Sequence, residues 1–200
     1  MRAFRRIFTG VSTILAPFGF AAGWLILTQR TEQGPNAGWS LSHVLFLLGV
    51  LLFIPAIAGF SRLINKTKPG AADIGKGLAQ IGLLALTGQF AIDLAVGQLA
   101  NDAPGLSSML GTVYASPLIM LSFQITAILF YVGLFMLTLV SIRLGIVPQW
   151  AGILTIIGII GVVGGSFSNL SITILLGFVV LGVGLAPIGL EIFRQPDGQM

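Results

Sequence analysis

Six long apolar runs, separated by short polar stretches, dominate the pattern of hydrophobic and polar positions along the chain. Each run holds about 20 mainly apolar residues, the number that an α-helix needs to cross the hydrocarbon core of a bilayer. The runs extend over residues 7–28, 41–64, 74–100, 116–142, 149–165 and 171–193. The pattern therefore predicts six transmembrane segments.

The six segments are predicted to be α-helices, because hydrocarbon offers no hydrogen-bonding partner to an exposed backbone group. A membrane β-barrel would show apolar and polar residues alternating along each strand, and none of the runs alternates in this way. The connecting stretches are too short for a separate soluble domain. The chain is thus expected to be all-α, with residues 1–200 forming a single transmembrane domain, a six-helix bundle.

The composition supports a lipid environment. Of the 200 residues, 56% are hydrophobic and 8% are charged, whereas soluble domains carry about 25% charged residues. The net charge of +4 at pH 7 sits in short clusters between the apolar runs and forms no basic face. The expected partner of the chain is therefore the lipid bilayer, and nucleic acid is not expected.

The distribution of basic residues predicts how the bundle is oriented. Nine of the ten Lys and Arg residues would lie on one side of the membrane, and Arg30 alone on the other. Because Lys and Arg are enriched on the cytoplasmic side, both termini are expected in the cytoplasm. The loops 29–40, 101–115 and 166–170 would then face outward. The nine residues are Arg2, Arg5, Arg6, Arg62, Lys66, Lys68, Lys76, Arg143 and Arg194.

Polar side chains inside a membrane are costly, so each one is a candidate for function. Gln89 and Asp93 lie four residues apart in the third segment and hence on one helix face. His43 lies in the first turn of the second segment, and Gln124 and Tyr131 share a stripe of the fourth. Since these helices alternate in direction, His43, Asp93, Gln89 and Gln124 are expected at comparable depths in the outer leaflet.

Two interpretations of this group stay open. In the first, the side chains line an outward-opening polar pocket that binds a small solute, a cation or a proton, with Asp93 as charged anchor and His43 as titratable partner. In the second, they join helices by hydrogen bonds in a non-catalytic membrane scaffold or partner protein. A cavity that reaches Asp93 from the outer face would favour the first interpretation, and side chains filling that space would favour the second.

Most catalytic chemistry is excluded by the residues that the sequence lacks. With no cysteine and one histidine, the chain cannot build a thiolate nucleophile, bis-histidine haem ligation or a His-Glu-x-x-His zinc site. A phosphate-binding loop and a Gly-x-Ser-x-Gly nucleophile motif are also missing, and no metal or other cofactor is expected. An enzyme acting on a lipid-soluble substrate, with Asp93 and His43 as acid and base, is the least favoured hypothesis.

Glycine is abundant, with 27 residues, and part of it is spaced for close helix contact. Gly19 with Gly23, and Gly161 with Gly165, form Gly-x-x-x-Gly pairs. With six helices to pack, contacts within one bundle explain these pairs better than dimerisation does. A second copy of the chain, or a membrane partner subunit, stays open as a binding partner.

The segment 145–154 reads Gly-Ile-Val-Pro-Gln-Trp-Ala-Gly-Ile-Leu. It resembles the Gly-x-x-Pro-x-x-x-Gly-x-Leu turn between two late helices of uncharacterised bacterial multi-helix membrane proteins. The resemblance implies a multi-pass protein of the bacterial cytoplasmic membrane and implies no particular activity. In size and helix number the chain is also similar to the substrate-binding subunits of vitamin transporters and to compact intramembrane proteases, but it lacks the protease's serine and histidine motif.

The predicted orientation can be tested on intact cells. A labelling reagent that cannot cross the membrane should fail to modify either terminus, because both tails are expected in the cytoplasm. Modification should appear once the membrane is permeabilised. External labelling of either tail would show that the basic residues do not set the topology of this chain.

Overall fold

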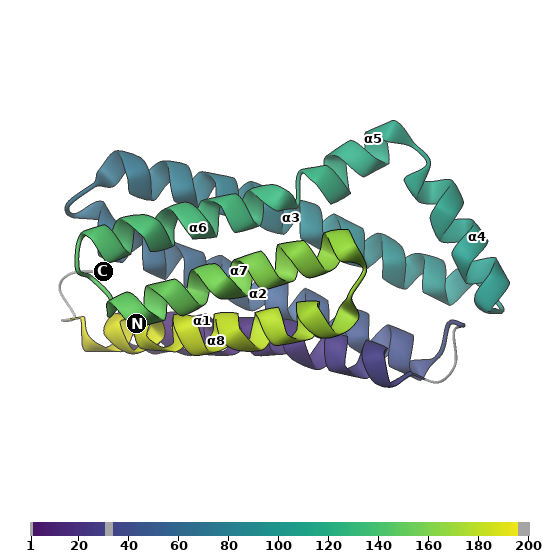
Figure 1. The fold of residues 1–200 in the computed structure, drawn as a ribbon, viewed down its shortest axis with the longest axis horizontal. Coiled ribbons are helices and arrows are strands. Elements are labelled where there is room, and N and C mark those ends of the chain that lie inside the picture. Colours follow the sequence, from purple (N-terminus) through teal and green to yellow (C-terminus); the bar gives the residue numbers. More distant parts are fainter. Residues whose placement is uncertain (1, 31–33, 196–200) are drawn as a thin grey trace.

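The protein is helical throughout the part of the chain that the structure, a computed structural model, describes: residues 2–30 and 34–195 contain helices and no strand (Figure 1). Six of the helical spans in this part are long and apolar enough to cross a membrane. The predicted all-α fold with six transmembrane segments is therefore confirmed. Residues 31–33 of the predicted loop 29–40 lie outside the described residues.

The helices run up and down in chain order, so that both described ends of the chain lie at the same end of the bundle (Figure 1). We call the opposite end, which carries α4, the outer end, in keeping with the predicted orientation. The bounds are α1 Arg2–Gln29, α2 Ala37–Asn65, α3 Pro69–Leu99, α4 Ala103–Tyr114, α5 Pro117–Ile119, the π-helix η1 Met120–Ile125, α6 Ile128–Arg143, α7 Gln149–Ser168 and α8 Ser171–Arg194.

The outer stretch 101–115, predicted as a loop, contains the helix α4, and the prediction was wrong there. Asp102 caps the start of α4, because its Oδ1 accepts a hydrogen bond from the backbone N–H of Gly105 at 2.6 Å. The apolar side of α4 packs on the outer end of α3, where Leu106 is buried against Val96. This short helix therefore covers the outer end of the bundle without crossing the membrane.

The fourth predicted segment, 116–142, is interrupted and not one continuous helix. It starts as α5, continues as η1, and resumes as α6 after a break at Thr126 and Ala127. The backbone N–H of Thr126 donates to the carbonyl of Leu121, five residues back, at 3.1 Å, and the Thr126 hydroxyl donates to the same oxygen at 2.7 Å. π-Helical turns redirect a helix, and in Figure 1 the part before the break leans away from α7.

Glycine lets the helices of the bundle approach one another closely. A Cβ placed on Gly19 of α1 would lie 3.1 Å from the Cα of Gly49 in α2, and one on Gly161 of α7 would lie 3.2 Å from the Cα of Gly177 in α8. Both glycines belong to the Gly-x-x-x-Gly pairs seen in the sequence. The prediction that these pairs serve contacts within one bundle is confirmed.

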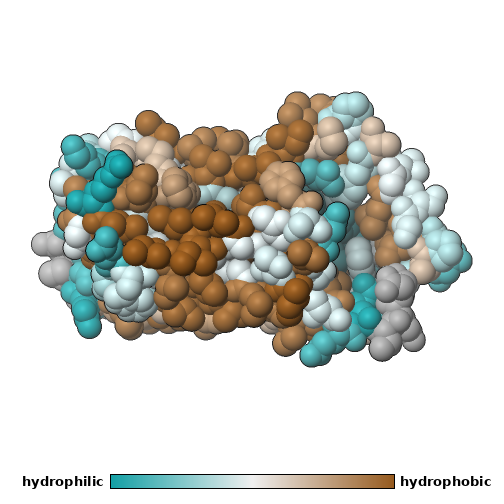
Figure 2. All heavy atoms as spheres, viewed as in Figure 1, coloured by the Kyte–Doolittle hydropathy of each residue, from teal (hydrophilic) through white to brown (hydrophobic). Residues whose placement is uncertain are grey.

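The outside of the bundle is apolar where lipid would surround it. Figure 2 shows brown, hydrophobic atoms across the middle of the visible face and teal, hydrophilic atoms toward both ends. Large apolar side chains are exposed on several helices, including Leu51, Leu84 and Ile160. A soluble protein rarely exposes so much contiguous apolar surface, so the surface supports the same conclusion as the helix lengths.

Replacing Gly82 with alanine should destabilise the bundle. The added Cβ would lie 2.0 Å from the backbone nitrogen of Phe130, which cannot move away without shifting α6. Overpacking of this kind typically costs about 1–3 kcal/mol. Thermal unfolding in detergent should therefore give a lower midpoint for Gly82→Ala than for the unchanged protein.

The matched control for this variant is Gly77→Ala on the same helix. Its added Cβ meets no other atom within 4 Å, so its midpoint should equal or slightly exceed that of the unchanged protein. Equal midpoints for the two variants would contradict the close contact between α3 and α6.

Candidate functional site

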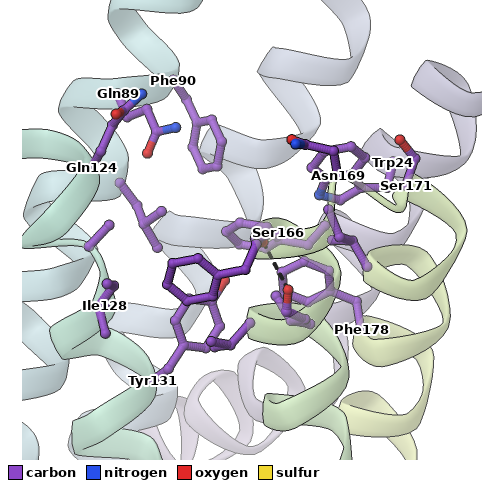
Figure 3. Close-up of a pocket in the computed structure, with 17 residues that line it drawn as sticks. Trp24, Gln89, Phe90, Gln124, Ile128, Tyr131, Ser166, Asn169, Ser171 and Phe178 are labelled. Atoms are coloured by element: carbon purple, nitrogen blue, oxygen red, sulfur yellow. Dashed lines mark hydrogen bonds between the residues drawn. The ribbon is translucent and has the colours of Figure 1, made fainter. Parts of the chain in front are cut away.

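A cavity of about 590 Å³ lies in the outer half of the bundle (Figure 3). It is bounded on one side by α3, η1 and α6, and on the other by α1, α7 and α8. Aromatic rings form much of its wall, among them Phe90 and the stacked pair Phe20 and Phe178, whose ring centroids are 4.7 Å apart. Among the described residues, no Asp, Glu, Lys, Arg or His side chain lines the cavity.

Three of the predicted site residues face this cavity: Gln89 from α3, Gln124 from η1 and Tyr131 from α6 (Figure 3). Within the described part of the chain, their side-chain polar groups form no hydrogen bond with the protein. A polar group removed from bulk water costs free energy unless it finds a partner. These three groups are therefore available to water or to a bound molecule.

The cavity has a polar mouth at the outer end of α7 and α8. Ser166, Asn169 and Ser171 line it there and are exposed to solvent. Asn169 ends α7 in the left-handed conformation, with φ of 55°, which asparagine tolerates better than most residues. This tight junction places all three polar side chains at the rim.

The cavity also has an apolar flank, between η1 and α7. η1 packs against α3 and α6, while α7 packs against α8 and α6, so over the described residues no extended packing joins η1 to α7. Ile128, at the start of α6 just after η1, and Phe167 of α7 both line the cavity and are 38% and 75% exposed. The flank would thus open toward the lipid of the outer leaflet.

The other two predicted site residues, His43 and Asp93, lie together outside the lining of the cavity. The imidazole Nε2 of His43 is 3.8 Å from Oδ2 of Asp93, and its Nδ1 is 2.8 Å from the carbonyl oxygen of Trp39. Trp39 in turn donates from its indole nitrogen to the Asp93 carbonyl at 3.1 Å. The structure thus separates the five predicted residues into a cavity group and a His–Asp pair.

Tyr114, at the end of α4, is a member of the second group that the sequence analysis missed. Its hydroxyl donates to Oδ1 of Asp93 at 2.7 Å. Burial raises the pKa of this hydroxyl, and the charge and hydrogen bond of Asp93 raise it further. Tyr114 therefore stays a proton donor at physiological pH and ties α4 to α3.

Within residues 2–30 and 34–195, no group of three or more His, Cys, Asp or Glu side chains could hold a metal ion. The fold and the site together define a polytopic α-helical membrane protein with a cavity in its outer half. No protein-family model, curated protein or solved structure matches the chain. The assignment of function consequently rests on the geometry of the two residue groups.

Tyr114→Phe should loosen α4. Removing the hydroxyl deletes the hydrogen bond to Asp93, and a bond to a charged acceptor contributes about 1.5–3 kcal/mol. Amide hydrogen exchange of residues 103–116, measured in detergent or nanodiscs, should therefore become faster, since local opening would cost less free energy.

The other tyrosine of the chain gives a matched control. Tyr131→Phe removes a hydroxyl that bonds to no described residue, so exchange in α4 should stay unchanged. If α4 exchanges at the same rate in both variants, the Tyr114–Asp93 hydrogen bond does not hold α4 in place.

Proposed function

We propose that the protein binds a small, uncharged, lipid-soluble molecule in the cavity between η1 and α7, as a transporter or as the binding subunit of one. The observation that carries the proposal is that the side-chain polar groups of Gln89, Gln124 and Tyr131 make no hydrogen bond to the described residues and lie among aromatic and aliphatic side chains of the cavity. Mostly apolar walls with a few placed polar groups are typical of sites for small molecules.

The lining of the cavity favours an uncharged ligand. A charged group moved from water into a site of low dielectric needs a counter-charge or several hydrogen bonds. The described lining offers neutral carboxamides and hydroxyls and no charged side chain. A ligand with an apolar body and one or two hydrogen-bonding groups would match it, whereas a cation would lack an anchor because Asp93 lies elsewhere.

The apolar flank favours entry from the membrane. A molecule dissolved in the outer leaflet would pass between Ile128 and Phe167, both of which are apolar and exposed. Its polar group would then meet Gln89 and Gln124 inside. A water-soluble solute would instead have to use the mouth near Asn169.

The cavity does not reach Asp93, and hydrogen bonds from Trp39 and Tyr114 join Asp93 to α2 and α4, so that part of the site fits the scaffold alternative. The alternative is less well supported by the residues of the cavity. Polar side chains that hold membrane helices together do so by hydrogen bonds from helix to helix. Gln89 and Gln124 make no such bond to any described residue. We place the protein in the bacterial cytoplasmic membrane as part of the proposal, on the resemblance of the turn 145–154.

The proposal predicts a bound molecule in protein purified in mild detergent. Native mass spectrometry should detect an added mass, and extraction should release an uncharged organic compound. The double variant Gln89→Leu, Gln124→Leu should bind it roughly tenfold more weakly or worse, since it removes two hydrogen-bonding partners. Each lost carboxamide would leave a polar group of the ligand without a hydrogen-bonding partner.

Gln80→Leu is the matched control, because Gln80 lies on α3 outside the cavity lining. This variant should retain the ligand as the unchanged protein does. Equal retention by the double variant and the control, or a charged compound in the extract, would count against the proposal.

A further inference from the structure

We infer that His43 and Asp93 form a proton-binding site at the outer ends of α2 and α3, in which the pair holds one shared proton. The inference goes beyond the proposed function and does not depend on it. It rests on which atoms around the His43 ring can donate a hydrogen bond and which can only accept one.

The surroundings of Nδ1 require a proton on that nitrogen. The carbonyl oxygen of Trp39, 2.8 Å away, can only accept a hydrogen bond. The Ser42 hydroxyl lies 3.3 Å from Nδ1, but it already donates its hydrogen to the same Trp39 carbonyl at 2.7 Å. Both neighbours of Nδ1 are thus acceptors, and Nδ1 is the donor.

A proton on Nδ1 determines what Nε2 presents to Asp93. In a neutral imidazole the second nitrogen carries a lone pair and no hydrogen. That lone pair would face Oδ2 of Asp93 at 3.8 Å, and an ionised carboxylate also offers only lone pairs. Two acceptors facing each other inside a protein repel and leave both groups unsatisfied.

One additional proton removes this conflict. It can reside on Nε2, which gives an imidazolium beside a carboxylate, or on Oδ2, which gives a carboxylic acid beside a neutral imidazole; at 3.8 Å the two atoms are at ion-pair distance and too far apart for a direct hydrogen bond. In both forms the pair carries no net charge. Tyr114 already donates to Oδ1, so Oδ2 is the oxygen left for the shared proton.

The environment favours a pair without net charge. The His43 and Asp93 side chains are 4% and 14% exposed, and aromatic rings surround the imidazole, with the centroids of Trp39 and Phe46 at 4.2 Å and 5.5 Å. A net charge is costly in such surroundings. Among the described residues, the other charged or titratable groups facing the pair are Tyr114 of α4 and Arg30 after α1, whose guanidinium carbon lies 5.3 Å from the Trp39 ring centroid.

The chain offers a direct test because His43 is its one histidine. The full-length protein, labelled with ¹⁵N-histidine and placed in lipid nanodiscs at neutral pH, will give the nitrogen signals of a single imidazole. We expect Nδ1 to be protonated. Nε2 should be either protonated, or unprotonated together with an infrared band of a protonated carboxyl group that Asp93→Asn removes.

Two results would overturn the inference: a neutral imidazole with its proton on Nε2, or an unprotonated Nε2 next to an ionised Asp93. The nitrogen signals of the unchanged protein decide the first of these results. If Asp93→Asn folds poorly, Asp93→Glu, which keeps the carboxyl group, assigns the infrared band by shifting it. Gln80→Leu serves as control, because Gln80 lies on α3 outside both groups of residues, and it should leave the imidazole signals unchanged.

Discussion

Close approach of helix backbones at glycine is the constraint on which the rest of this structure depends. In lipid the hydrophobic effect does not drive helices to associate. Van der Waals contact between closely packed backbones therefore has to supply much of the attraction. Gly82 and Gly133 let α3 and α6 meet backbone to backbone, and Gly158 does the same for α7 against α8. Side chains larger than hydrogen at these positions would force the helices apart.

The position of the cavity follows from where such contacts end. α6 and α7 meet near their shared turn at the inner end, where Gly152 of α7 contacts Ile142. Farther out, the break at Thr126 turns η1 away from α7, and η1 instead follows α3, where Phe123 packs over Gly88. The cavity is therefore the space left between η1 and α7, because η1 packs on α3 and not on α7.

The six membrane spans could be predicted from the sequence, because the hydrocarbon thickness sets the number of residues that a spanning helix needs, and this number can be counted in the apolar runs.

The helix α4 could also have been found. Asp102 followed by Pro104 is a common helix start, although the sequence analysis predicts a loop over 101–115. The break at Thr126 carries no such signal, since Pro117 lies at the start of the run, Gly133 lies beyond the break, and no proline or glycine occurs between them.

The candidate site was predictable in depth but not in grouping. Residue counting along alternating helices places His43, Asp93, Gln89 and Gln124 in the same leaflet, and the structure has all four in the outer half. Which of these four side chains contact one another depends on how each helix is rotated about its axis and on which neighbouring helices extend to that level of the bundle. One sequence does not contain this information. Tyr114 lies outside the predicted site for a related reason, because the sequence predicts a loop where the structure has α4.

Helix length explains why two residues one turn apart on α3 belong to different groups. α3 has 31 residues and α7 has 20, so α3 is longer by roughly 16 Å and extends beyond the junction of α7 and α8 (Figure 1). At the level of Gln89, the neighbours of α3 include η1 and the space beside α7. One turn farther out, the side chain of Asp93 contacts His43 of α2 and Tyr114 of α4. The shorter hairpin thus keeps the charged pair out of the uncharged cavity.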